Sequence, residues 1–224
     1  MSTRTFGAAT IITPDLDEPG LYLSDVTTLD NPRRAVQDFA FGDADLRSLE
    51  LADTQLITGR LHGVRAQRVA FEALNLHGVE ITGSELGAAR WNGSKLTRVV
   101  IRDTKLLGAA LDDLVLDDVL FENCKLDYAA FTKARATGPV AFAGCVLTEA
   151  TFTDCDLSSV VFSDCTLRLT DFGPGRYRST DLRGNDLTTL RGVTNLAKVR
   201  IGPDQQHDLA QALVDDLEIT IGDD

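Results

Sequence analysis

Large apolar residues recur at every fifth position from Phe41 to Leu187, with one slip of a single residue. The first run has 19 positions and ends at Phe131, and the second has 10 positions and begins at Phe142. Only 43% of the chain is hydrophobic, so composition alone does not produce such a run. A period of five fits neither the 3.6 residues of a helix nor the 2 of a strand. A fixed repeat of this extent predicts a solenoid.

The position two residues before each large residue is also restricted. It holds a small or medium side chain, as at Ala44, Val79 and Cys155. The other three positions of each unit carry most of the charged residues and glycines, as outward-facing positions do. Two inward residues per five predict a coil with a narrow, dry core.

The units themselves resemble a known family. Ala-Asp-Leu-Arg-Ser at 44–48, Cys-Asp-Leu-Ser-Ser at 155–159 and Thr-Asp-Leu-Arg-Gly at 180–184 follow the pattern A-(D/N)-L-x-x. With about thirty units over roughly two-thirds of its length, the chain resembles the pentapeptide-repeat proteins. The resemblance implies a right-handed quadrilateral β-helix, with one unit per side, four units per coil and about seven coils.

The β-helix is expected over residues 36–197, with the slip near 133–141. One extra residue there, next to Gly138 and Pro139, is typical of a bulge that turns one corner late. The bulge is either a tolerated insertion, which we favour, or a kink that presents a surface.

Residues 1–35 lack the repeat. Short strands are expected over 10–13 and 21–23, around a turn-rich stretch at 14–20. Because the end of a solenoid exposes its core, this segment is interpreted as an N-terminal β cap. The alternative is a separate binding arm.

Residues 198–224 predict a second cap. A helix should begin at Gly202-Pro203-Asp204, since proline and an acidic residue favour the first turn. A short strand is expected over 219–221. Several members of the resembled family dimerise through a C-terminal helical module, so the resemblance implies a homodimer; the alternative is a monomeric cap. One face of the predicted helix carries the dimerisation candidates, which are Leu209, Ala212, Leu213 and Leu217.

No catalytic constellation is visible. The chain has no glycine-rich phosphate loop, paired-cysteine motif or zinc signature, and acid pairs such as Asp112-Asp113 lack a cleft on a convex rod. We therefore expect no enzyme activity, no cofactor and no metal. The cysteines occupy the inward small position and are expected to be free, buried and inert; they are Cys124, Cys145, Cys155 and Cys165.

No apolar run approaches the ~20 residues of a membrane span, and the N-terminus lacks the pattern of a signal peptide. A cytoplasmic protein without a membrane partner is expected.

The formal net charge of −12 fits one branch of the resembled family. Its gyrase-protecting quinolone- and fluoroquinolone-resistance members are rods whose acidic surface resembles DNA and occupies the DNA-binding saddle of a type II topoisomerase. That saddle is basic because it holds phosphates, and complementary charge speeds encounter.

In this chain the acidity is local. Residues 41–105 hold 8 acids and 9 bases, whereas residues 106–171 hold 11 acids and 4 bases. These acids should encircle a coil as a belt. They either bind a protein partner or only keep the protein soluble. The partner-binding candidates are Asp112, Asp113, Asp117, Asp118, Glu122, Asp127 and Asp154.

One outward position is apolar in successive coils. Val100, Leu120, Ala141 and Val161 should stack on one side of the rod, and such a column predicts that something packs on it. We favour the N-terminal segment over a second subunit or a partner.

The sequence thus favours a non-catalytic protein-binding module. Its most concrete form is a DNA-mimicking modulator of DNA gyrase that does not itself bind nucleic acid. The alternative is a structural or scaffold protein with no topoisomerase role.

Overall fold

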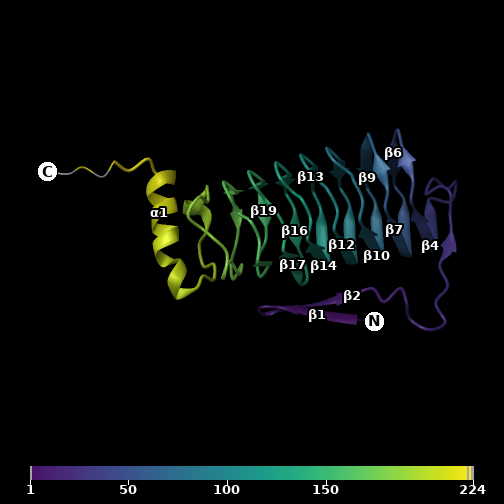
Figure 1. Cartoon of the computed structure of the whole chain (residues 1–224), viewed down its shortest axis with the longest axis horizontal. Helices are drawn as coiled ribbons and strands as arrows, with labels where there is room; N and C mark the ends of the chain where they lie inside the picture. Colours follow the sequence, from purple (N-terminus) through teal and green to yellow (C-terminus); the bar gives the residue numbers. More distant parts are fainter. Residues whose placement is uncertain (1, 221, 223–224) are drawn as a thin grey trace.

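The computed structural model describes residues 2–220 and 222, which wind into a rod of about seven coils closed by one helix (Figure 1). Strands pair in parallel with their equivalents one coil later. Leu56, Leu76 and Leu96, for example, lie side by side at a spacing of 20 residues. The solenoid predicted from the fivefold repeat is confirmed, as is the all-β fold that the resemblance implies.

Each coil has four sides. In the coil from 75 to 92, β10 (Asn75–Thr82) bends at Gly78, which has a φ of +66°, so that its two halves form two sides. A bridge at Glu85 forms the third side, and β11 (Arg90–Asn92) forms the fourth. One five-residue unit therefore makes one side, as the resemblance implied.

The strands follow this plan along the rod. The two sides made by β10 are continued by β3 (Ser24–Asp25), β4 (Ala35–Gly42), β7 (Gln55–His62), β12 (Lys95–Arg102), β14 (Val115–Glu122), β16 (Arg135–Ala136), β17 (Val140–Ala143), β19 (Cys155–Asp156), β20 (Val161–Ser163) and β22 (Gly175–Arg176). The third side has β5 (Asp45–Leu46) and β8 (Arg65–Ala66). The fourth side has, besides β11, the strands β6 (Leu49–Ala52), β9 (Val69–Glu72), β13 (Ala110–Asp112), β15 (Ala130–Thr132), β18 (Thr151–Thr153) and β21 (Asp171–Phe172).

Aromatic ladders fill the second half of the core. The rings of Phe131 and Phe152 stack with centroids 4.8 Å apart, and Phe142 stacks on Phe162 at 4.9 Å. All four cysteines are buried and free, as expected; their lack of reactivity stays a prediction. Burial raises the pKa of the Cys155 thiol to about 11.

The slip lies at a corner of the coil. Leu116 pairs with Ala136 and Val119 pairs with Val140, so residues 137–139 face only Asp117 and Asp118. The residue at this corner has a positive φ in other coils, as at Arg98 and Asp118. Proline is restricted to a negative φ, and Pro139 stands at the equivalent place. The extra residue allows the chain to turn there without the left-handed conformation.

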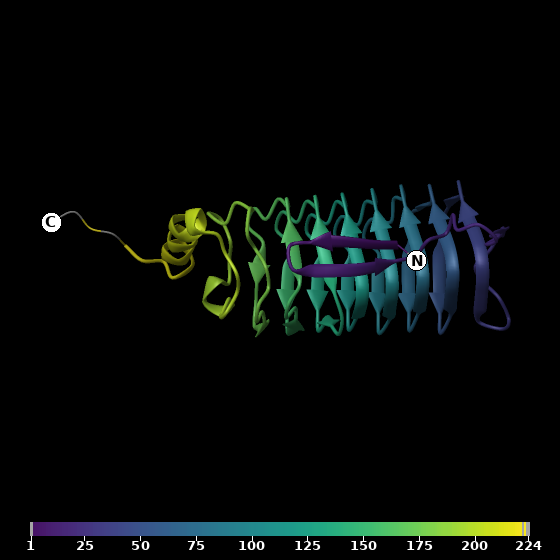
Figure 2. The same ribbon diagram turned by 90° about the horizontal axis from the view of Figure 1, so that it is seen from below.

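The N-terminal segment has two parts. Strands β1 (Ser2–Phe6) and β2 (Ala9–Thr13) form an antiparallel hairpin that lies along the side of the rod rather than over its end (Figure 2). The end itself is covered further along the segment, where Leu29 is buried in the core and Val26 packs against it.

The prediction of a strand over residues 21–23 is wrong. The strand here is β3, which pairs with β4, while Tyr22 is 85% exposed. No strand of the described chain pairs with 21–23, so their apolar side chains gain no burial from a sheet.

The C-terminal helix α1 (Gln206–Asp216) follows two short 3-10 turns, Val193–Asn195 and Pro203–Gln205. Ala212 is fully buried against the last coil and Leu209 is partly buried. The Asp216 carboxylate accepts hydrogen bonds from the backbone N–H groups of Gly192 (3.0 Å) and Val193 (2.9 Å). The helix therefore closes the end of the core.

Of the dimerisation candidates, Leu213 and Leu217 are 36% and 50% exposed, whereas Ala212 is buried. The strand expected over 219–221 is not found in its described part, residues 219–220, and Ile221, like residues 223–224, lies outside the described residues.

Candidate functional site

The seven candidate acids are distributed around the coil rather than along one side. Asp112 ends β13 on the fourth side, and Asp113 occupies the next corner. Asp154 stands two coils further on at the same corner, since the backbones of Asp113, Lys133 and Asp154 follow one another. The other candidates lie on β14 or on the third side: Asp117, Asp118, Glu122 and Asp127.

Three of these acids also meet a backbone requirement. Asp113, Asp118 and Asp154 have φ values of +49°, +52° and +56°. Aspartate, asparagine and glycine adopt this left-handed conformation more readily than other residues. Part of the acidity of the coil is therefore explained by the geometry of its corners.

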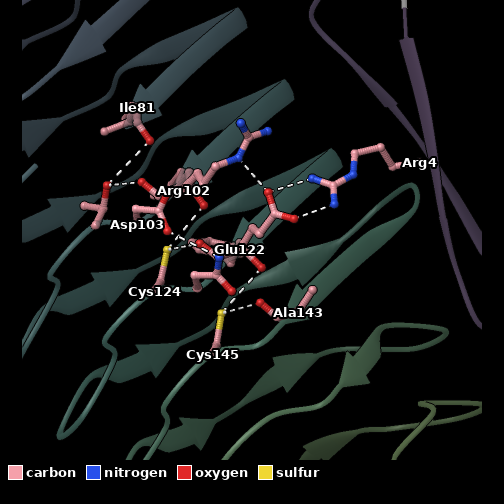
Figure 3. Close-up of polar contacts among 12 residues, drawn as sticks. Arg4, Ile81, Arg102, Asp103, Glu122, Cys124, Ala143 and Cys145 are labelled. Carbon is pink, nitrogen blue, oxygen red and sulfur yellow. Dashed lines mark hydrogen bonds and ion pairs between the residues drawn. The ribbon is translucent and has the colours of Figure 1, made fainter. Parts of the chain in front are cut away.

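Glu122 is engaged within the molecule (Figure 3). Its carboxylate accepts hydrogen bonds from Arg4 Nη1 and from Arg102 Nε, both at 2.6 Å, and Arg4 Nη2 pairs with its second oxygen. The Glu122 side chain is only 15% exposed. The hydrogen bonds from Arg4, followed by those from Arg102, hold the pKa of Glu122 below its ordinary value of 4.5.

The remaining acids divide into two groups. Asp118 Oδ1 accepts a hydrogen bond from the backbone N–H of Ile12 at 2.9 Å, and Asp113 lies 3.5 Å from Arg135 in an ion pair. Within residues 2–220 and 222, the other four carboxylates have neither an ion pair nor a hydrogen bond. They are Asp112, Asp117, Asp127 and Asp154.

The apolar column lies under the hairpin. Val100, Leu120, Ala141 and Val161 are at most 5% exposed and form one cluster with Ala9, Ile11 and Phe6. The alternation of β2 places Ala9, Ile11 and Thr13 toward the coil. We call the part of the rod formed by Val79–Thr82 and its equivalents, on which the hairpin lies, the hairpin side (Figure 2).

Sequence reasoning missed the first strand of this hairpin. Ser2–Phe6 contains one large apolar residue, and its pairing with β2 offers no core-facing alternation. Arg4, the partner of Glu122, lies 118 positions away from it, and no local signal connects the two.

The described residues hold no group of three or more His, Cys, Asp or Glu side chains placed to bind a metal ion. A cavity of about 440 Å³ opens between the hairpin tip and the coil, where Pro139, Val161, Asp181 and Arg200 contribute to the wall. The Asp181 carboxylate in this wall already forms an ion pair with Arg183 at 2.6 Å. This contact holds the pKa of Asp181 below its ordinary value. The arrangement favours surface recognition.

Part of the repeat matches a known family. Residues 114–191 match the family model described as the pentapeptide repeat region. This part of the chain is a pentapeptide repeat region. No curated protein matches the chain in sequence. No helix in its described part is long and apolar enough to cross a membrane.

One solved structure superposes well enough on this chain to show a shared fold. A trypsin-treated form of QnrB1, a plasmid-mediated fluoroquinolone resistance protein, superposes with a TM-score of 0.58 at 14% identity, covering 89% of this chain and 96% of that chain. Full-length QnrB1 gives a TM-score of 0.44 at 16% identity, over 80% of this chain and 89% of that one. At 14% identity, the likeness to the trypsin-treated form shows the fold alone.

Proposed function

We propose that this protein is a non-catalytic binding rod that presents a DNA-like acidic surface to a type II topoisomerase, DNA gyrase, in the cytoplasm. The observation that carries the proposal is the set of four carboxylates in the acidic half of the coil that have no partner among the described residues. The likeness in fold to a fluoroquinolone resistance protein supports it, because it extends over 96% of that chain.

Particular side chains of the acidic surface are proposed to contact gyrase. Asp112 and Asp154 lie near one corner of the rod, and Asp127 lies on the third side. These carboxylates would take the place of DNA phosphates on the basic saddle of the enzyme. Asp118 and Glu122 are held by the hairpin, so we assign them a structural role and not direct recognition.

A supercoiling assay with purified gyrase, with and without a fluoroquinolone, tests the proposal. The test variant combines Asp112→Asn, Asp117→Asn, Asp127→Asn and Asp154→Asn, which are the four carboxylates without a partner among the described residues. We expect the native protein to inhibit or protect the enzyme at micromolar concentration and the variant to lose that effect.

The matched control combines Asp43→Asn, Asp45→Asn, Asp53→Asn and Asp103→Asn, which removes the same charge from the near-neutral half of the coil. In both variants the Asn replacements keep a residue that tolerates the left-handed corners. Equal loss in both variants would point to net charge alone, and no effect of the native protein would exclude the topoisomerase role.

An exposed apolar patch at the C-terminal end favours a second candidate function, assembly of a scaffold. Leu213, Leu217 and Ile219 are 36%, 50% and 50% exposed. We propose that this patch joins two copies end to end. Sedimentation of the native protein should then show a dimer that the double variant Leu213→Lys, Leu217→Lys lacks. A dimer without any effect on gyrase would leave the scaffold role in first place.

A further inference from the structure

The hairpin is attached to the coil almost entirely by side chains. Strands β1 and β2 form a two-stranded sheet of their own, separate from the sheets of the coil. Ile11 and Ala9 pack on Leu120 and its neighbours. The polar ties are the Arg4–Glu122 pair and the hydrogen bond from the Ile12 N–H to Asp118. Docking of the hairpin is therefore a surface interaction between two separately folded pieces of chain.

The apolar and acidic side chains of the hairpin side determine which kind of segment can bind there. An apolar strip from Val100 to Val161 runs between Asp118 at one corner and Glu122 on the other flank. At the tip of the hairpin, Gly7 lies against Val161 and Asp181. The surface fits a two-stranded segment with alternate apolar residues and one arginine, which is what β1–β2 supplies.

The connection between hairpin and coil permits a second arrangement. Residues 14–23 contain neither strand nor helix. Extended, ten residues span about 33 Å at ~3.3 Å per residue, which is long enough to reach a neighbouring rod. The connection is held by burial of Leu16 and by an ion pair of Asp17 with Arg60 at 3.4 Å. These contacts are released when the hairpin leaves its own coil.

We propose that the hairpin side is an interaction surface that accepts the β1–β2 hairpin of a second copy of this chain, so that two copies exchange hairpins. An isolated two-stranded hairpin is marginally stable in water, and its departure exposes the apolar strip. An opened chain therefore gains by closing on the coil of another opened chain, where every contact of the closed monomer is reproduced. Such an exchange is reciprocal and closes as a two-fold dimer. It is independent of the proposed gyrase role and of the patch on α1.

Charge reversal tests the exchange. Arg4→Glu places two carboxylates together in one chain, and Glu122→Arg places three guanidinium groups together in another, because Arg102 also binds this position. Either variant alone should lose the protection of the amides of residues 9–13 from hydrogen exchange. In an equimolar mixture, only exchanged pairs join the acidic hairpin of the first variant to the basic coil of the second. The same pairs join the native hairpin of the second variant to the native coil of the first.

We expect mixing to restore protection of residues 9–13 to the native level and to double the mass relative to each variant alone. The matched control carries both substitutions in one chain; it should regain protection without mixing, and it shows whether Arg102 tolerates the reversed partner. Protection regained in the control but not in the mixture would overturn the proposal.

If Glu122→Arg fails to fold, a deletion variant tests the hairpin exchange instead. Deleting residues 18–20 shortens the connection to seven residues, which removes the slack that lets the hairpin fold back on its own coil. The proposal predicts a dimer with a protected hairpin. A monomer with an unprotected hairpin would overturn it. Because the patch on α1 is unchanged in all these chains, dimerisation there does not alter protection of residues 9–13.

Discussion

Phe121 and Phe142 stack with ring centroids 4.7 Å apart and planes inclined by 5°, although they are 21 positions apart rather than 20. The extra residue is accommodated entirely at the corner formed by residues 137–139. The core therefore continues through the slip as if it were absent.

Deletion of Pro139 should be tolerated. It leaves Gly138 at the corner, and glycine adopts the left-handed conformation that the other coils use there. We expect a change in the free energy of unfolding within about 1 kcal/mol, or roughly 2–4 °C in Tm. Deletion of Arg98, at the same corner of an earlier coil, is the control and should unfold the protein, because it leaves that coil one residue short. Equal damage from both deletions would refute this account of the slip.

Leu120→Lys should release the hairpin. Leu120 is fully buried by β2, and burial of a leucine side chain contributes about 2 kcal/mol. Hydrogen exchange of residues 9–13 should become fast while the coil keeps its protection. Leu107→Lys, at a side chain that is 41% exposed, is the control and should leave the hairpin protected. An unchanged hairpin in the Leu120 variant would show that the apolar column does not hold it.

Acid should loosen the same contact. The pKa of Glu122 is lowered in the folded state, chiefly by the hydrogen bond from Arg4. Its contribution to stability is therefore present above the ordinary value of 4.5 and is lost as pH falls through the lowered pKa. Near neutral pH, the free energy of unfolding of the native protein should exceed that of Glu122→Gln by about 2 kcal/mol. This difference should vanish in strong acid. A difference that does not change with pH would rule out titration of Glu122 as the cause.

Replacement of Asp154 should separate charge from backbone conformation. Asp154→Asn keeps a residue suited to a φ of +56° and should leave the Tm nearly unchanged. Asp154→Val introduces a β-branched residue into the left-handed region and should cost about 1–2 kcal/mol. Thermal unfolding distinguishes the two. If the asparagine variant is as unstable as the valine variant, the carboxylate itself stabilises the corner.

Burial should protect all four cysteines from thiol reagents in the native protein. Cys155 has a pKa raised by burial to about 11, so little thiolate exists at neutral pH. Its Sγ donates a hydrogen bond to the carbonyl of Phe131 at 3.4 Å. Labelling should require unfolding, and all four thiols should then react together. Fast labelling of the folded protein would contradict the packing of these coils.

The core of the rod could be predicted because the large residue of each five-residue unit faces inward. Leu76 and Leu96 face inward for a reason that depends only on the five-residue spacing and not on their neighbours. The docking of the hairpin could be anticipated only in outline. The column from Val100 to Val161 predicts a covering segment, whereas Ser2–Phe6 has no pattern that identifies it as a strand.

The ends of the chain were harder to predict for a physical reason. Local patterns do not say which neighbour an apolar side chain will meet. Tyr22 lies in an apolar triplet but has no strand beside it, and Leu213 shares a predicted helical face with Ala212 but points outward. The helix crosses the end of the coil, so the small residue makes the close contact.

The same uncertainty applies to the acids. Their positions are plain in the sequence, but the division into engaged and free carboxylates is not. Glu122 is neutralised by a residue from the other end of the chain, and Asp118 accepts a hydrogen bond from a backbone amide of β2. Only the folded arrangement separates them from Asp112 and Asp127.

The closure of the last coil by α1 has a consequence for self-association. A stack of parallel strands ends in unpaired N–H and C=O groups, which are a template for strands of another molecule. By covering Leu190 and binding the amides of Gly192 and Val193 through Asp216, the helix withdraws that template. A chain cut before Gln206 should therefore associate in pairs through this opened end, because the N-terminal end of the rod stays covered by the segment around Leu29.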